Sequence, residues 1–300
     1  MQLQLGIDDC FAVKRWPRTA DWGPIVRNRL GLRLVQHTFD LVDLGVDDPA
    51  ALRQASSELG LELHSTFTGL AAYSSNLLLH PAPEARRAAE DWYGAAIDWT
   101  AAAGGRATGG HVGAFSVADW NDPGTRRERW SDLRASLARL AERARAAGLD
   151  HLLVENLAAA REPSTMPMIR DLVTGGDSDH VPIRLCLDVG HMCVPGTSGP
   201  ERDPYAWLAS MGTLATVVQL QQSDPGGDHH WPFTAARNAA GRVDADRTID
   251  ALGEGGVESC ALILEVIPAF EQPDDDVLGD LVESVDYWRE ALDRRGVLAP

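Results

Sequence analysis

The sequence predicts a (β/α)8 barrel that occupies residues 1–300 as a single domain. Three observations predict it: short apolar strands alternate with longer amphipathic helices, about eight such units fit the length, and no linker rich in Pro, Gly and Ser divides the chain. Several strands are continuous Leu, Val and Ile runs, as is typical of parallel strands buried on both faces. An open doubly wound sheet is the alternative, although no GxGxxG or P-loop sequence follows the first strand.

The predicted strands are short and follow one another at regular intervals along the chain. They are Leu3–Ile7, Arg33–Phe39, Leu61–Thr66, Ala107–Val112, His151–Glu155, Ile183–Asp188, Val217–Gln221 and Ala261–Val266. Helical patterns separate them, such as the apolar face of Leu133, Leu137, Leu140 and Ala144. Each strand with the helix that follows it is therefore one unit of the predicted barrel.

The composition excludes some partners. The chain has 300 residues, 44% of them hydrophobic, a formal net charge of -17 and a pI of about 4.8. An acidic surface without basic runs repels nucleic-acid backbones and anionic membranes, so neither is expected as a partner. No apolar run reaches the length of roughly 18 residues that a membrane helix needs, and no signal peptide is recognisable. The cysteines, Cys10, Cys186, Cys193 and Cys260, form no CxxC pair, which favours reduced thiols in a cytoplasmic protein.

Three predicted strands end in a carboxylate. Glu155 ends LLVE, Asp188 ends LCLD and Glu265 ends LILE. In a barrel of this kind, side chains at the carboxyl ends of the strands face the active site. Buried charges that converge cost several kcal/mol each unless something neutralises them, and a divalent cation does so. We therefore predict that these carboxylates share a metal ion, whereas a helix N-cap or a surface charge is the alternative for any one of them.

Other polar residues follow the remaining strands. The second strand reaches His37 and Asp40, and we predict that His64 and His111, after the third and fourth strands, line the active site. A buried core histidine that is satisfied by the protein is the alternative for each. Lys14, beyond the first strand, either binds an anionic group of a substrate or faces solvent.

The seventh strand ends in Gln221 and leads into the loop SDPGGDHHWPF. We predict that Asp228, His230 and Trp231 of this loop contact the substrate, because the loop leaves a strand end that faces the active site. The alternative is that Trp231 and Phe233 anchor a long loop to the rim of the barrel.

The segments LLVENL, LCLDVGH, DHHW and LILEV, in this order, resemble the xylose-isomerase-like barrel superfamily. That superfamily includes sugar-phosphate isomerases and epimerases, ketose 3-epimerases, inosose dehydratases and endonuclease-type DNA-repair enzymes. The resemblance covers most of the chain, and it is more specific for the superfamily than for any one reaction.

The resemblance implies that Glu155, Asp188 and Glu265 bind the metal, that the two glutamates act as the acid–base pair, and that His191 contacts substrate oxygens. A histidine usually supplies the fourth ligand at the end of the seventh strand, where this chain has Gln221. A ligating Gln221 carbonyl makes the shell all oxygen, which favours Mn²⁺, with Mg²⁺ or Co²⁺ as alternatives, over Zn²⁺. Alternatively, His230 or Asp228 supplies the fourth ligand from the following loop.

The sequence therefore predicts a divalent-metal-dependent isomerase or epimerase. Its substrate is a small ketose or aldose, with or without a phosphate, and protons move through a cis-enediolate. One alternative is a lyase on a keto-sugar, such as an inosose-type dehydratase or an enzyme that cleaves 3-keto C-glycosides. Another is a sugar-binding barrel without catalysis. Barrels of this type often pair, which leaves a homodimer open.

Overall fold

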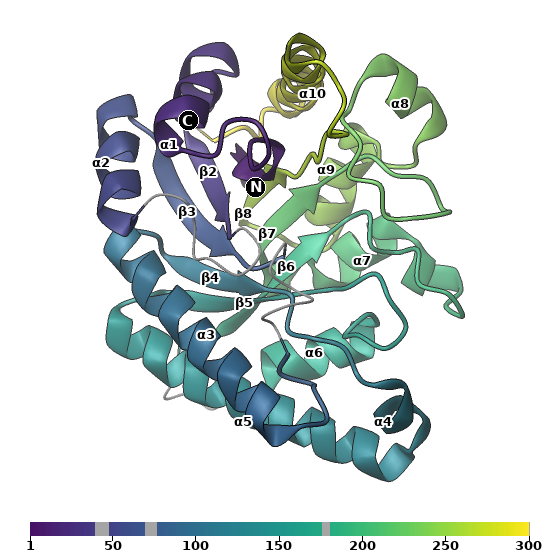
Figure 1. Cartoon of the computed structure of the whole chain (residues 1–300). Helices are drawn as coiled ribbons and strands as arrows, with labels where there is room; N and C mark the ends of the chain where they lie inside the picture. Colours follow the sequence, from purple (N-terminus) through teal and green to yellow (C-terminus); the bar gives the residue numbers. More distant parts are fainter. Residues whose placement is uncertain (40–47, 70–76, 176–180, 300) are drawn as a thin grey trace. The chain divides into compact units, whose positions relative to one another are not determined.

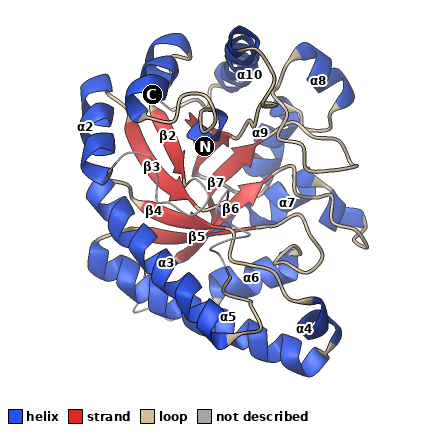
Figure 2. Ribbon diagram, viewed as in Figure 1, coloured by secondary structure: helices blue, strands red, loops and turns tan. Residues whose placement is uncertain are grey.

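The computed structural model describes residues 1–39, 48–69, 77–175 and 181–299, and over these residues the strands form a closed barrel in sequential order (Figure 1). The strands are β1 (Gln2–Asp8), β2 (Leu34–Thr38), β3 (Glu62–Phe67), β4 (Ala107–Gly110), β5 (His151–Glu155), β6 (Ile183–Asp188), β7 (Ala215–Leu220) and β8 (Ser259–Leu264). Helices follow the strands along the chain, as Figure 2 shows. The predicted (β/α)8 fold is confirmed, while Asp40 lies outside the described residues.

The chain comprises two compact units. Unit 1 contains Met1–Gln36, Gln54–Glu62 and Cys186–Pro300, and unit 2 contains His37–Arg53 and Leu63–Leu185. Strands β2 and β6 and helix α2 (Pro49–Leu59) have residues in both units. That residues 1–300 form a single domain stays a prediction.

Unit 1 is built around β1, β7 and β8, which are parallel neighbours. Leu5 of β1 is in register with Leu262 of β8, and Leu262 is in register with Val218 of β7. These runs are buried because apolar helix faces cover them, and Trp207 and Trp288 are fully enclosed. The helices of this unit are α1 (Thr19–Pro24), α7 (Pro204–Met211), α8 (Ala235–Ala240), α9 (Ala245–Glu254) and α10 (Asp274–Arg295).

Unit 2 is built around the parallel strands β3, β4 and β5. Strand β4 carries Gly109, where an added Cβ would lie 2.0 Å from the Leu153 carbonyl oxygen of β5, so only glycine fits the close approach of these strands. The long helices α3 and α5 pack on each other, and α5 buries the apolar face that begins at Leu133. The helices of this unit are α3 (Pro83–Ala103), α4 (Val117–Asn121), α5 (Pro123–Ala147) and α6 (Met166–Thr174).

Membrane-spanning helices and disulfides both bear on the predicted environment of the protein. None of the helices within the described ranges is long and apolar enough to cross a membrane. None of the four cysteines is in a disulfide, and Cys10, Cys186 and Cys260 are buried.

Candidate metal centre

The carboxyl ends of β6, β7 and β8 bring three predicted site residues to one level of unit 1. Asp188 is the last residue of β6, Gln221 directly follows β7, and Glu265 directly follows β8. The Glu265 backbone N–H donates to the Leu220 carbonyl oxygen at 2.9 Å, which fixes this alignment. All three side chains are buried, although they are polar and follow strand interiors that are apolar. The predicted convergence of Asp188 and Glu265 therefore has a direct structural cause.

The loop that follows β7 turns back toward this strand end. The backbones of Gln222 and Trp231 form two hydrogen bonds, of 2.9 and 3.1 Å, which close the loop. His230 stands just before this bridge in the left-handed conformation, with φ of 49°, and its carbonyl oxygen accepts from the Ile267 N–H at 3.1 Å. A non-glycine residue in this conformation costs free energy and persists only where its surroundings fix it. The loop is therefore built to hold His230 in one place.

The loop residues make close polar contacts with the strand ends. Asp228 lies between two histidines, with Oδ1 3.2 Å from His230 Nε2 and Oδ2 3.2 Å from His191 Nε2. His230 Nδ1 lies 3.6 Å from Glu265 Oε2. Burial of Asp228 acts in the opposite direction, but the hydrogen bonds with His191 and His230 hold the pKa of this carboxyl well below its usual range. Asp228 is therefore an anion that orients both imidazole rings.

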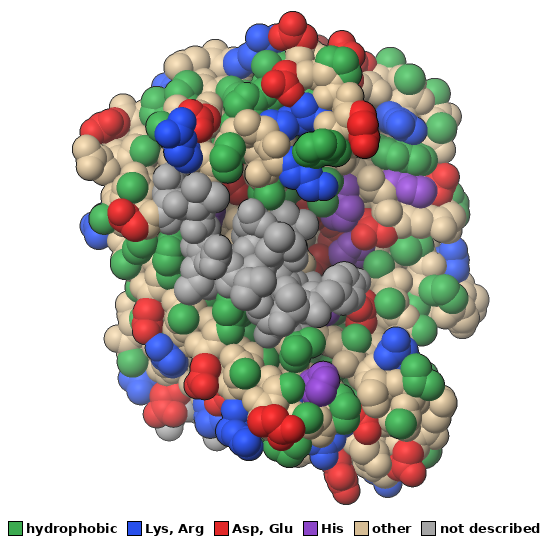
Figure 3. All heavy atoms as spheres, in the orientation of Figure 1, with side chains coloured by type: hydrophobic (Ala, Val, Ile, Leu, Met, Phe, Trp, Pro, Cys, Tyr) green, Lys and Arg blue, Asp and Glu red, His purple; other side chains and the backbone are tan. Residues whose placement is uncertain are grey.

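The donor atoms of unit 1 fit a divalent cation. One ligand atom each of Asp188, His230 and Glu265 lies within 4.8 Å of the others, and the same is true of His191, Asp228 and His230. His230 Nδ1 is buried and makes no hydrogen bond to the residues that the structure describes, whereas the other ring nitrogen contacts Asp228. A carboxylate on one imidazole nitrogen with the second nitrogen open is the usual arrangement of a metal-ligating histidine. Figure 3 shows histidine side chains, in purple, next to acidic side chains, in red, on one face of the molecule.

Gln221 does not present its carbonyl oxygen to this group. Its Oε1 accepts from the backbone N–H groups of His229, at 3.3 Å, and His230, at 2.7 Å. Its Nε2 instead faces the carboxylates of Asp188 and Asp228. An amide NH₂ is a donor and cannot ligate a cation. The arrangement therefore does not support Gln221 as a ligand and favours the alternative in which His230 comes from the loop.

His191 and Glu155 occupy the positions that the sequence indicated for them. His191 follows β6 in a turn where Asp188 Oδ1 accepts the N–H groups of Gly190, at 2.6 Å, and His191, at 3.2 Å. Glu155 is the last residue of β5, in unit 2, and is buried. Its role as a metal ligand and as a catalytic base stays a prediction.

His64 does not lie where the sequence analysis placed it. Strand β3 continues to Phe67, and Arg106, which precedes β4, donates its backbone N–H to the His64 carbonyl oxygen. His64 is thus near the amino-terminal edge of these strands, where its ring contacts that of His151, the first residue of β5. Active sites of (β/α)8 barrels lie at the opposite edge. The prediction that His64 lines the active site is wrong, because the pairing of β3 with β4 places His64 near the amino-terminal edge of these strands.

His111 follows β4 at the carboxyl edge, as predicted, but both ring nitrogens already contact protein groups. Nε2 lies 3.3 Å from Glu162 Oε1, and Nδ1 accepts from the Gly113 N–H at 3.1 Å. The tautomer with the proton on Nε2 satisfies both contacts. This arrangement favours the alternative of a histidine that holds loops together.

Trp231 anchors the loop after β7. One face of its indole stacks on the His229 ring, with centroids 4.0 Å apart, and the Arg237 guanidinium covers the other at 4.3 Å. With both faces covered, the ring is not available for stacking on a sugar, so the structure supports the anchoring alternative. Lys14 is exposed, and its Nζ lies 5.7 Å from the centre of the Phe270 ring, so binding of an anionic group there stays a prediction.

Arg242 was not identified from the sequence. Its guanidinium donates to the carbonyl oxygens of Gly190, at 3.1 Å, and Met192, at 3.2 Å, and thereby fixes the turn that carries His191. No local motif marks Arg242, because Met192 and Gly190 are 50 and 52 residues away in the chain.

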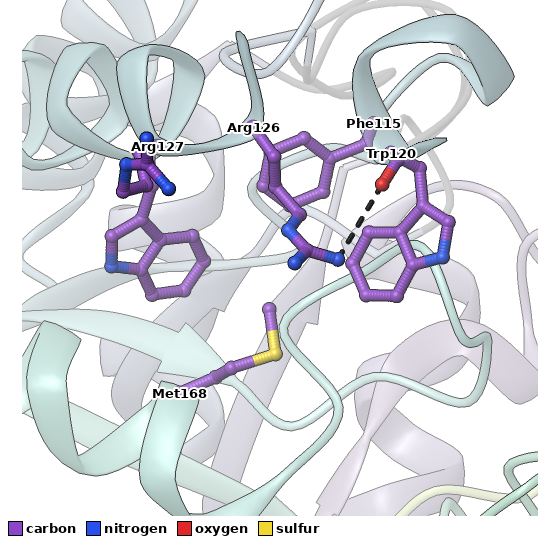
Figure 4. A pocket seen from close by; sticks show the side chains of 6 residues that line it. Phe115, Trp120, Arg126, Arg127 and Met168 are labelled. Carbon is purple, nitrogen blue, oxygen red and sulfur yellow. Dashed lines mark hydrogen bonds between the residues drawn. The ribbon is translucent and has the colours of Figure 1, made fainter. Parts of the chain in front are cut away.

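A separate cavity of about 320 Å³ lies in unit 2 (Figure 4). Its walls come from α4, α5, α6 and the segment before α4, and comprise Phe115, Trp120, Arg126, Arg127, Trp130 and Met168. Arg126 lies over the ring of Trp120, with its guanidinium carbon 5.0 Å from the ring centre. None of the residues that the sequence analysis assigned to the site lines this cavity.

Comparison with known proteins agrees with the fold. Residues 28–293 match the family model described as xylose isomerase-like TIM barrel, and the chain belongs to this family. D-erythrulose 1-phosphate 3-epimerase of Brucella abortus (strain 2308) is 28% identical to this chain, over 98% of this chain and 97% of its own length.

Solved structures are similar along nearly the whole chain. A Rhodospirillum rubrum protein provisionally named xylose isomerase is 33% identical, with a TM-score of 0.87 over 99% of this chain and 100% of its own. D-psicose 3-epimerase of Clostridium cellulolyticum H10, solved with D-tagatose, covers 96% of this chain and 99% of its own. It has a TM-score of 0.70 at 15% identity and therefore shows the shared fold alone.

Proposed function

We propose that the protein is a divalent-metal-dependent sugar epimerase that inverts C3 of a short ketose or ketose phosphate. The observation that carries the proposal is the group of Asp188, His230 and Glu265, whose ligand atoms lie within 4.8 Å of one another. The name of the Brucella abortus relative, a 3-epimerase of D-erythrulose 1-phosphate, supports both the reaction and the substrate class.

In this proposal Asp188, Glu265 and His230 hold the cation, with Glu155 as the further ligand that the sequence predicts. When bound, a divalent cation acts as a Lewis acid on a ketose carbonyl and its neighbouring hydroxyl, and thereby acidifies the carbon between them. Three carboxylates and one imidazole are a donor set that Mn²⁺ accepts, and Mn²⁺ is the proposed ion; Mg²⁺ and Co²⁺ are the alternatives. Because one ligand is a histidine, the oxygen-only argument against Zn²⁺ is weaker than the sequence suggested.

The side chains of the chain supply the proton transfers. Glu265, buried directly after β8, takes the C3 proton of the ketose, and the electron pair of that bond moves toward the carbonyl to give an enediolate. Glu155 returns a proton to C3 from the other face, which inverts this carbon. His191, oriented by Asp228 at 3.2 Å, holds a substrate hydroxyl.

The same proposal covers the binding partner, the cellular compartment and the oligomeric state of the protein. The partner is a small sugar, and neither nucleic acid nor membrane is involved. Buried cysteines that form no disulfide support a cytoplasmic enzyme, because disulfides are rare in that compartment. A homodimer is the proposed assembly, and sedimentation of the purified chain tests it.

The decisive experiment measures exchange and product together. Wild type with Mn²⁺ in D₂O is expected to incorporate deuterium at C3 of erythrulose 1-phosphate or another ketose and to form the C3 epimer. Glu265→Gln is expected to lower the rate by about 10²–10⁴-fold. Glu258→Gln is the matched control, since this exposed residue precedes the same strand at its other end.

Deuterium exchange without an epimer, or release of water or an aglycone, would point to the isomerase or lyase alternative. Equal rates for wild type and Glu265→Gln would refute the proposal.

A further inference from the structure

The Gln221 side chain has one orientation, fixed by contacts at both ends of its amide. Oε1 accepts two backbone N–H groups, at 2.7 and 3.3 Å. Nε2 donates to Asp228 Oδ1 at 2.7 Å and lies 3.1 Å from both Asp188 oxygens. A flipped amide would set donors against donors at one end and acceptors against carboxylates at the other. The five contacts therefore define which atom is nitrogen.

The space for this amide is made by a glycine in the turn after β6. A Cβ added to Gly190 would lie 2.3 Å from the Gln221 carboxamide carbon and 2.6 Å from both its nitrogen and its oxygen. Real contacts are never this short, so a side chain at residue 190 would displace the amide. The turn that carries His191 is thus shaped around Gln221.

The contacts of Gln221 reach each part of the candidate metal centre in unit 1. Its oxygen fixes the backbone of His230, whose left-handed φ of 49° needs such support. Its nitrogen joins Asp188, on β6, to Asp228, on the loop. Asp228 in turn contacts the Nε2 atom of His230, which leaves Nδ1 facing Glu265.

We propose that Gln221 is a positioning residue of the metal centre: it does not ligate the ion, but it holds His230 and Asp228 in the geometry that binds it. The inference rests on the proposed function for the metal, and goes beyond it by assigning the geometry of the loop to one buried amide. Residues that orient metal ligands typically contribute about 10–100-fold to metal affinity.

The first arm of the test needs no metal. Hydrogen exchange of the metal-free full chain is measured over residues 222–231 for wild type, Gln221→Leu and Gln219→Leu. Gln219 is the matched control, because it is equally buried two residues earlier, within β7, but bonds to Gln36 and Cys186 instead. Gln221→Leu is expected to speed exchange of the His229 and His230 amides by about tenfold or more, and Gln219→Leu to leave them within about twofold. Unchanged exchange in Gln221→Leu would overturn the proposal.

The second arm adds Mn²⁺ and separates a positioning residue from a ligand. Pulsed EPR of the wild type is expected to show nitrogen coupling from a bound imidazole, and His230→Asn to weaken it. Gln221→Leu is expected to weaken the same signal and to raise the Mn²⁺ dissociation constant about 10–100-fold. A Gln221→Leu protein with wild-type nitrogen coupling would overturn the proposal. If the wild type does not bind Mn²⁺, the proposed function fails, while the exchange measurement still decides the role of Gln221 in the loop.

Discussion

The loops that carry His230, in unit 1, and His111, in unit 2, look alike until the second ring nitrogen is considered. Each imidazole contacts a carboxylate through Nε2, at 3.2 Å from Asp228 and 3.3 Å from Glu162. Nδ1 of His111 accepts the Gly113 N–H, whereas Nδ1 of His230 makes no hydrogen bond within the described part of the chain and lies 3.6 Å from Glu265. A histidine whose two nitrogens are bonded to protein stabilises the fold, while one with an open, buried nitrogen beside a carboxylate is prepared for a ligand.

The largest expected difference is in metal affinity. His230→Asn removes the imidazole, yet asparagine tolerates the left-handed backbone, so the loop keeps its path. We expect this change to weaken Mn²⁺ binding by about 100-fold or more, beyond the usual effect of residues that only orient ligands. Titration calorimetry measures it, with His111→Asn as the control that stays within about threefold. Equal losses in the two variants would remove the distinction between the two loops.

The unfolding free energy is expected to show the opposite pattern, with the larger loss in His111→Asn. His111→Asn leaves the buried Glu162 carboxylate without its imidazole contact, and the unmet polar group costs about 1–3 kcal/mol of unfolding free energy. Urea denaturation of the metal-free chain measures this difference. A His111→Asn protein as stable as the wild type would contradict the structural role of His111.

A third histidine, the half-buried His64, extends the comparison to pH. Burial and then the charge of Arg106 lower the pKa of His64 from 6.5 to about 4. Because the unfolded chain takes up this proton first, the stability from the neutral ring is complete above about pH 6.5 and declines as pH falls toward 4. The decline is up to about 1.4 kcal/mol per pH unit for one proton.

His64→Leu is expected to flatten the dependence of urea unfolding free energy on pH between pH 7 and pH 5. The same slope in wild type and variant would show that His64 is protonated at its ordinary pKa. His151, whose pKa burial also lowers to about 4, contributes to the slope that remains.

The smallest expected effect is at the surface of the loop. Arg237→Ala removes a guanidinium from one face of Trp231, while the backbone bridge to Gln222 remains. We expect a loss of about 0.5–1 kcal/mol in unfolding free energy and Mn²⁺ affinity within about twofold of wild type. A large loss of affinity would mean that the stack on Trp231, rather than the buried amide, holds His230.

The strands could be predicted because burial on both faces leaves long apolar runs. His151–Glu155 and Ile183–Asp188 have the same bounds in sequence and structure, while the second and fourth strands are shorter than predicted. Asp188 and Glu265 could be placed because each ends such a run. His64 could not, because its height depends on the pairing of Ser65 with Ala107, which the local sequence does not encode.

The roles of Gln221 and Trp231 depend on where a loop returns. The bridge between Gln222 and Trp231 brings the His230 N–H to Gln221 Oε1 and the Asp228 carboxylate to its Nε2. A glutamine at a strand end can ligate a metal through its oxygen or donate hydrogen bonds through its nitrogen. Only the positions of its partners distinguish these two roles. An aromatic residue in a loop is ambiguous in the same way until its neighbours are known.

The absence of a side chain at Gly190 has an evolutionary consequence. The space that a methyl group would need is filled by the amide of a residue 31 positions further along the chain. Among descendants of this sequence, a larger residue at 190 is therefore tolerated only together with a smaller one at 221, and the two positions should mutate as a pair.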